Sequence, residues 1–187
     1  TAILTQPLGQ ANIGFVSVAL PHSEFLEQGH IRTNCTRVQF AAEQCPKASI
    51  YGHAEAITPL LDQPLTGPVY LRSSSHRLPD LVAALKGPPS QPIEVDLDGR
   101  IDSFKGGIRT TFETVPDAPV SKFVLRMQGG KKSLLVNSTD ICKGKHKATV
   151  EMVGQNGKEH NFSPLVEPKC PKKKGGKKGA KKQKGAK

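Results

Sequence analysis

Apolar and polar residues alternate along most of the chain from residue 93 onward. In the segment IEVDLDGRI the apolar positions are Ile93, Val95, Leu97 and Ile101, with charged residues between them. A period of two is typical of a β-strand that buries one face. The sequence therefore predicts a half-buried strand over this segment.

Turn signals separate this strand from others of the same kind. KGG (105–107) predicts a turn from which IRTTFETV returns, and PDAP (116–119) predicts a second turn. KFVLRMQ alternates again, and Gly129-Gly130 predicts a tight hairpin from which KSLLVN returns. KATVEMV and the residues after Asn156-Gly157 predict one more hairpin. Together these elements predict an antiparallel meander.

The first half of the chain is less regular. IGFVSVAL (13–20), SIYGHAEAIT and GPVYLRS predict strands, and LPDLVAALKG fits a short helix or, as we favour, a strand. HSEFLEQ and TRVQFAAEQ predict short helical turns, the first of them capped by Ser23. We therefore expect a mainly β fold: an antiparallel sandwich or meander, immunoglobulin-like or jelly-roll-like, with one or two short helices.

Positive charge is concentrated in the last 17 residues. The formal net charge is +11, from 27 Lys and Arg against 16 Asp and Glu. Residues 171–187 contain nine of these basic residues and none of the acidic ones, which leaves 18 basic against 16 acidic residues in 1–170. We therefore divide the chain into a β domain (1–170) and a lysine-rich tail (171–187). The tail is predicted to be disordered because it has too little apolar surface to bury.

The tail predicts adhesion to polyanions. Its lysines would attract anionic cell-envelope polymers, a membrane surface or, without sequence preference, nucleic acid. The nearly neutral body argues against a broad basic face that grips nucleic acid. The candidate polyanion-binding residues are Lys172, Lys173, Lys174, Lys177, Lys178, Lys181, Lys182, Lys184 and Lys187.

The four cysteines predict an oxidising compartment. They lack the C-x₂-C spacing of a zinc or redox site. Three pairings are possible, and spacing favours Cys35–Cys45 with Cys142–Cys170. Disulfides favour a secreted or cell-surface location over the cytosol. The sequence has no apolar run that would make a transmembrane segment, and it starts at Thr1 without a signal peptide, so we expect a processed protein or a piece of a longer secreted chain.

One polar segment carries residue types that are used in nucleophilic catalysis. SSSHRLPD contains Ser73, Ser74, Ser75, His76 and Asp80 within eight residues. A catalytic triad needs side chains that converge from separate segments, whereas neighbours in an extended chain point to opposite faces. We therefore interpret this segment as an exposed polar loop or strand edge and predict no catalytic residue.

One acidic segment has a partial calcium-loop pattern. Glu94, Asp96 and Asp98 fall on the first, third and fifth positions, but Lys105 stands where the bidentate Glu belongs. The alternation of these acids with apolar residues favours an acidic strand face. We keep the three residues as a weak calcium candidate, and the sequence implies no other metal and no cofactor.

Several blocks of the sequence carry a family resemblance. They are CTRVQFAAEQCPKASIYGHA, TPLLDQPLTGPVYLRSSSHRLPDLVAALKG, GRIDSFKGGIRTTFETVPDAPVSKF, QGGKKSLLVNSTDIC and GQNGK. Over most of residues 11–170 the chain resembles a group of exported, disulfide-containing, β-rich proteins of actinobacteria, a group with no assigned activity. The resemblance implies export, a disulfide-stapled β domain and a place at the C-terminal end of a longer secreted chain.

These observations lead to one expected function and two alternatives. We expect a non-enzymatic extracellular or cell-surface β module whose tail associates with anionic envelope polymers or lipid headgroups. The body would then bind a protein or glycan partner. The alternatives are nucleic-acid binding through the tail and hydrolysis of a wall polymer at a site that no motif marks.

Overall fold

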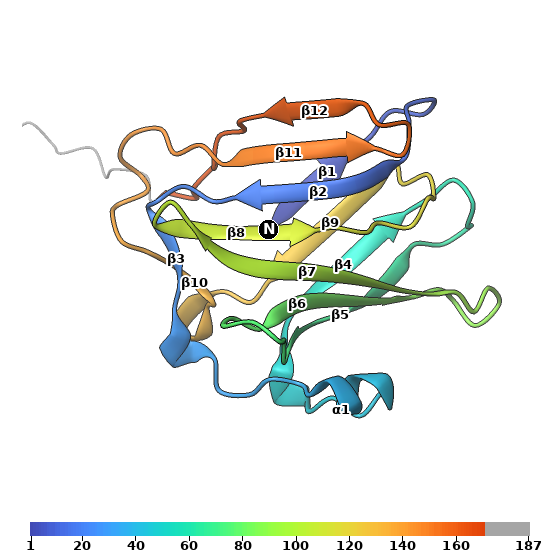
Figure 1. Cartoon of the computed structure of the whole chain (residues 1–187), viewed down its shortest axis with the longest axis horizontal. Helices are drawn as coiled ribbons and strands as arrows, with labels where there is room; N and C mark the ends of the chain where they lie inside the picture. Colours follow the sequence, from blue (N-terminus) through green and yellow to red (C-terminus); the bar gives the residue numbers. More distant parts are fainter. Residues whose placement is uncertain (171–187) are drawn as a thin grey trace, which may run out of the picture.

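The structure is a computed structural model of the chain, and it describes residues 1–170 (Figure 1). This part is mainly β, as the sequence predicts, with ten strands in one antiparallel sheet and two in another. The large sheet has the order β1-β9-β4-β5-β6-β7-β8-β2-β11-β12, and β10 pairs with β3. The strands are β1 (Ala2–Thr5), β2 (Ile13–Ala19), β3 (Glu24–Leu26), β4 (Ile50–Ile57), β5 (Leu65–Arg72), β6 (Asp80–Lys86), β7 (Glu94–Phe104), β8 (Gly107–Phe112), β9 (Lys122–Met127), β10 (Leu135–Asn137), β11 (Thr149–Gly154) and β12 (Glu159–Phe162).

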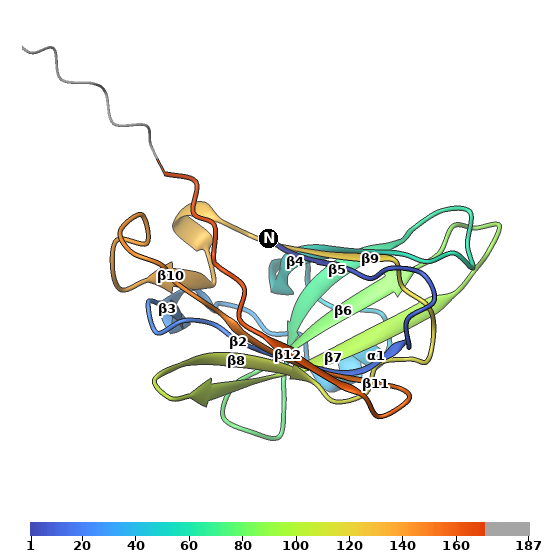
Figure 2. The same cartoon turned by 90° about the horizontal axis from the view of Figure 1, so that it is seen from above.

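The large sheet is strongly curled. Figure 2 shows β4, β5 and β9 along one side and β2, β8, β11 and β12 along the other, with β6 and β7 between them. Side chains of cross-strand partners share a face, so Val69 of β5, Ala83 of β6 and Leu97 of β7 point the same way. Apolar residues on this face form the core, where Val69 and Leu71 are fully buried. One curled antiparallel sheet, in which β4 to β8 form a meander, thus takes the place of the two separate sheets of a sandwich.

The acidic residues of β7 lie on the opposite, outer face of the sheet. Glu94, Asp96 and Asp98 are exposed, whereas Val95 and Leu97 between them pack against the core. The half-buried strand predicted from the alternation is therefore correct. It begins one residue later than the pattern suggests, because Ile93 lies outside the ladder and is 43% exposed.

A glycine on the inner face of β7 makes room for an aromatic ring. Gly99 pairs with Phe112 of β8. A Cβ atom on Gly99 would lie 2.8 Å from the Phe112 ring, closer than real contacts allow. The ring thus fills the space left by the missing side chain and covers the Gly99 backbone.

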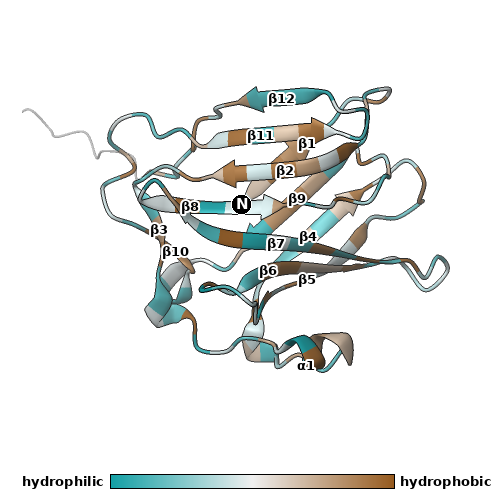
Figure 3. Ribbon diagram, viewed as in Figure 1, coloured by the Kyte–Doolittle hydropathy of each residue, from teal (hydrophilic) through white to brown (hydrophobic). Residues whose placement is uncertain are grey.

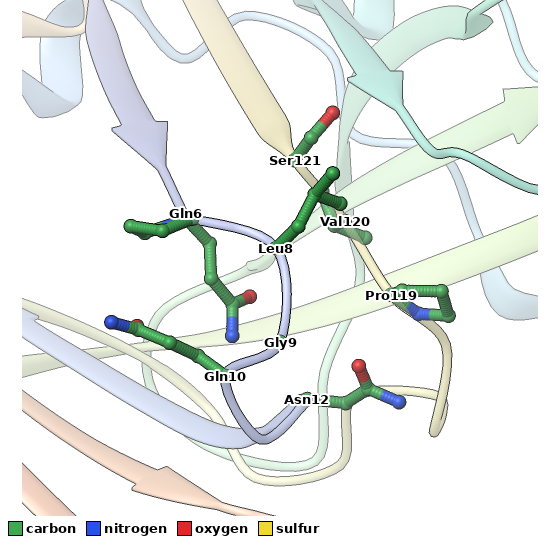
Figure 4. Close-up of a pocket in the computed structure, with 9 residues that line it drawn as sticks. Gln6, Leu8, Gly9, Gln10, Asn12, Pro119, Val120 and Ser121 are labelled. Atoms are coloured by element: carbon green, nitrogen blue, oxygen red, sulfur yellow. The ribbon is translucent and has the colours of Figure 1, made fainter.

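Two connections cross between the halves of the curled sheet at one end. Residues 6–12 join β1 to β2, and residues 113–121 join β8 to β9. The Gln6 amide donates to the Ser121 carbonyl (3.0 Å), and the Val115 amide donates to the Gly14 carbonyl (3.1 Å). The hollow between the two connections (Figure 4) has a volume of about 30 Å³, the size of one water molecule. We regard it as a packing gap.

The short helices lie in the connections between strands. They are α1 (Arg37–Ala41) and the 3₁₀ turns η1 (Gln28–His30), η2 (Lys47–Ser49) and η3 (Gly130–Lys132). The helical turn predicted from TRVQFAAEQ is α1, and Thr36 caps it in a capping box with Gln39.

The structure differs from the sequence prediction around β3 and β10. HSEFLEQ was expected to be a helical turn, but it contains strand β3 and leads into η1. KSLLVN was expected to return along β9, but its strand β10 pairs with β3, with Leu135 opposite Leu26. Leu134 is 3% exposed and belongs to the core, with Leu26 and Leu135 packed against it. This packing pulls both segments out of the predicted arrangement. Strand β1 was not predicted at all.

Two disulfides fasten the ends of irregular segments. Cys35 is bonded to Cys45 across α1, and Cys142 is bonded to Cys170. This is the pairing that the spacing favours. Beside the second bond, the Ala148 amide donates to the Pro164 carbonyl (3.0 Å) and the Val166 amide to the His146 carbonyl (2.8 Å). The last described residues are thus paired with the segment that leads into β11.

Candidate functional site

An open groove of about 500 Å³ lies on the outer face of the sheet. This volume falls in the range of small-molecule sites. Its floor comes from β6, β7 and β8, and α1 contributes Arg37. The groove is lined by Arg37, Arg72, His76, Asp80, Asp96, Asp98, Arg100, Thr111, Glu113, Thr114 and Pro116.

The backbone around Cys35 sets the position of the groove's arginines. Cys35 is fully buried and forms a parallel β-bridge with Arg72. The Cys35 amide donates to the Leu71 carbonyl (2.8 Å), and the Ser73 amide donates to the Cys35 carbonyl (2.8 Å). Because Cys35 directly precedes the N-cap of α1, these bonds also place Arg37, whose Nε donates to the Ser73 carbonyl (3.3 Å).

Arg72 is the centre of the groove's charge network. Its Nη2 lies 3.0 Å from Asp98 Oδ2 and 3.5 Å from Asp80 Oδ2, and its guanidinium carbon lies 5.2 Å from the centre of the Phe40 ring. Phe40 also packs edge-on against Tyr70, with ring centres 6.0 Å apart. Two carboxylates at the same guanidinium nitrogen and the Phe40 ring against the guanidinium hold it in one orientation.

Asp80 and Asp98 both pair with Arg72, whereas the nearby Asp96 has no such partner among the described residues. Asp98 pairs with Arg72, and Glu94 pairs with Lys86 (2.8 Å). Asp96 stands between them on the strand and pairs with no described side chain. Burial raises the pKa of the Asp96 carboxyl above its ordinary value, and the Asp98 charge adds to this effect, while Arg72 opposes it.

The structure brings part of the SSSHRLPD segment into this groove. The His76 Nε2–H donates to Asp80 Oδ1 (2.8 Å). The Ser74 hydroxyl instead bonds the main chain, donating to the Leu78 carbonyl and accepting from the His76 amide (3.2 Å). Ser74 therefore stabilises the turn, and His76 has an acidic partner without a serine partner. Sequence analysis did not identify Arg37, Arg72 or Arg100, because isolated arginines carry no motif.

The weak calcium candidate has the geometry of a strand. Glu94, Asp96 and Asp98 lie along the outer face of β7, where Lys86 and Arg72 bind two of the three carboxylates. Within residues 1–170, no group of three His, Cys, Asp or Glu side chains is arranged to hold a metal ion. The segment is therefore an acidic strand face, as the alternation predicts.

A serine–histidine pair that the sequence did not indicate lies at the other end of the molecule. Ser23 Oγ lies 3.0 Å from His146 Nδ1, and the His146 Nε2–H donates to the Lys143 carbonyl (2.9 Å). Ser23 is only 7% exposed, whereas His146 is half-buried. It fastens the segment before β11 to β3. The two residues are 123 positions apart, and no local pattern links them.

Comparisons with protein-family models, with curated proteins and with solved structures found no match for this chain. In the described part of the chain, no helix is both long and apolar enough to cross a membrane. The two disulfides indicate an oxidising environment. The predicted polyanion-binding lysines, Lys172 to Lys187, and the predicted disorder of the tail lie outside the described residues.

Proposed function

We propose that the protein is an exported, non-enzymatic β module that adheres to anionic polymers of the cell envelope through its lysine-rich C-terminal segment. The observation that carries the proposal is the Cys142–Cys170 disulfide, with Cα atoms 5.8 Å apart. It ties the folded body to Cys170, two positions before the first of the nine tail lysines. A covalent link at this point transmits an anchoring force from the tail to the body.

Exposed lysines on the folded body carry the same positive charge as the tail. Lys143, Lys145, Lys147 and Lys169 are all exposed in the two segments that the disulfide joins. Lys143 forms an ion pair with Asp140, at 3.5 Å, and its side chain remains 85% exposed. These lysines extend the positive charge of the tail onto the folded body.

The expected adhesion is electrostatic. A lysine close to an anionic surface contributes about 1 kcal/mol at physiological ionic strength. All nine lysines together would contribute about 9 kcal/mol, whereas half of them would give only about 4–5 kcal/mol, which is millimolar-range binding. Stable association therefore needs most of the tail lysines to engage. The attraction is screened over about 8 Å at physiological salt, so binding should weaken steeply as salt rises.

Export is supported by the two disulfides and by the resemblance to exported actinobacterial proteins. An extracellular location would place the tail within reach of envelope polymers that carry phosphate or carboxylate groups.

The test is retention of the full chain on purified cell-wall material at two salt concentrations. A variant with all nine tail lysines changed to glutamine should lose most of its retention at low salt. A variant with only four tail lysines changed (Lys172, Lys173, Lys174 and Lys177) should also lose retention. The matched control removes the same charge from the body (Lys47, Lys105, Lys122 and Lys158) and should be retained like the unchanged protein. Equal retention of the nine-lysine variant would overturn the proposal. Displacement from the wall by an equal charge of duplex DNA would favour the nucleic-acid alternative.

A further inference from the structure

The groove around Arg72 presents many hydrogen-bond donors and acceptors, and its positive and negative charges nearly balance. Three guanidinium groups face four carboxylates, and two threonine hydroxyls lie among them. A strongly charged ligand would gain little from such a surface, because attraction and repulsion nearly cancel. A neutral ligand with many hydroxyl groups gains from it, because each hydroxyl both donates and accepts.

The charged groups at the centre are fixed before any ligand arrives. Arg72 is held by Asp80, Asp98 and Phe40, and Asp80 is held in turn by His76. Their backbone is fastened through the fully buried Cys35 and its disulfide. Groups that are already ordered lose little conformational entropy on binding, which is a general property of ligand sites.

Some hydrogen-bonding capacity in the groove is unused. Asp96 lies between two paired carboxylates and has no described partner of its own. Arg72 Nε is buried and has no hydrogen-bond partner among the described residues. Desolvation raises the pKa of Asp96, so a hydroxyl that donates to its carboxylate would offset part of this cost.

We propose that this groove is a saccharide-binding site, in which Asp96 accepts sugar hydroxyls and Arg100 and Thr111 bind neighbouring oxygens. Arg100 and Thr111 are cross-strand partners on β7 and β8, so they present adjacent groups on one face. The Arg72 network positions Asp98 and Asp80. This site acts independently of the lysine-rich tail and supplies the body with a partner of its own.

The affinity for a short oligosaccharide should be low. Among the described residues, no Phe, Tyr or Trp lines the groove, so the site lacks the large flat platform against which sugar rings stack in tight sites. We expect a dissociation constant on the order of 1 mM.

The experiment is an NMR titration of the full chain with three neutral probes: chitotetraose, cellotetraose and maltotetraose. At least one probe should shift the amides of residues 96–100 and 111–114 in a saturable way. Asp96→Asn should weaken that binding about tenfold or more without lowering the thermal midpoint. Asp62→Asn, at an exposed position in the β4–β5 connection, is the matched control and should bind like the unchanged protein.

Two results would overturn the proposal. One is the absence of saturable shifts in the groove with all three probes at concentrations about tenfold above the expected dissociation constant. The other is equal weakening by Asp96→Asn and Asp62→Asn. The nine-lysine tail variant should bind the sugar normally, so failure of the adhesion proposal and failure of this one can be told apart.

Discussion

Arg72 at the end of β5 reaches across β6 to form an ion pair with Asp98 of β7, at 3.0 Å. The two side chains are unequally covered, with 15% of Arg72 exposed against 58% of Asp98. The pair links two strands that do not hydrogen-bond to each other. It therefore ties the floor of the groove together at a point where the backbone ladder cannot.

Replacing Arg72 by alanine should destabilise the fold by about 1–3 kcal/mol. The change removes the contact with Phe40 and takes the guanidinium from both Asp98 and Asp80, of which only Asp80 keeps a partner, His76. The exposure of Asp98 keeps the loss below that of a fully buried pair. Urea unfolding measures the effect. Arg126→Ala, which breaks the exposed pair with Glu55, is the control and should cost less than about 1 kcal/mol. Equal costs for the two variants would contradict the role assigned to Arg72.

Replacing Gly99 by alanine should cost about 1–3 kcal/mol, because the new methyl group collides with the Phe112 ring. The ring would have to rotate away and uncover the backbone at position 99. Gly129→Ala serves as the control, since nothing lies within 4 Å of a Cβ at that position. Its effect should stay within about 0.5 kcal/mol. Thermal unfolding of both variants checks the prediction. An unchanged melting temperature for Gly99→Ala would contradict it, because the Phe112 ring could then make room for the methyl group without loss of stability.

Removing the second disulfide by Cys142→Ser with Cys170→Ser should destabilise the protein by about 3–4 kcal/mol. The bond closes a segment with a sequence separation of 28, and chain-entropy reasoning gives this magnitude. The measurement is urea unfolding, combined with peptide mapping under non-reducing conditions to verify the pairing. Unchanged unfolding would mean that residues 142–170 are held by their other contacts alone.

Glu24 should make the stability of the protein depend on pH. Burial raises the pKa of its carboxyl in the folded state, and the neighbouring His146 partly opposes this shift. The stability that protonated Glu24 contributes is complete below its unfolded pKa of about 4.3 and is lost as pH rises through the folded pKa.

Glu24→Gln should therefore gain thermal stability relative to the unchanged protein as pH rises from about 4 to 6. The exposed Glu159→Gln is the control, and its offset from the unchanged protein should not vary over this range. A constant offset for Glu24→Gln would argue against a raised pKa.

The strands that alternate most regularly were the easiest to predict. β7 was identified because one of its faces packs on the core and the other faces solvent. Apolar and polar residues therefore alternate along residues 94–104. HSEFLEQ was predicted wrongly because a serine before a short amphipathic stretch also suits a helix start. Its strand depends on β10, more than a hundred residues away, and local pattern carries no information on such a partner.

The groove could be predicted only in fragments. Asp80, Asp96 and Asp98 were noted in separate motifs, but their convergence depends on the pairing of β5, β6 and β7 and on the bridge between Cys35 and Arg72. The three arginines went unnoticed because their role is defined by the side chains that surround them. Spacing along the chain marks local elements well, whereas a site assembled from several strands is a property of the strand order.

The edge strands of the large sheet affect whether copies of the protein can associate through their sheets. β1 and β12 have only four residues each, and Pro7 and Pro164 follow within two positions of their ends. β12 is largely hydrophilic (Figure 3). Short edge strands that are soon followed by proline give a neighbouring copy little unpaired backbone to extend. Copies that come close together should therefore stay separate particles and not join edge to edge into fibrils.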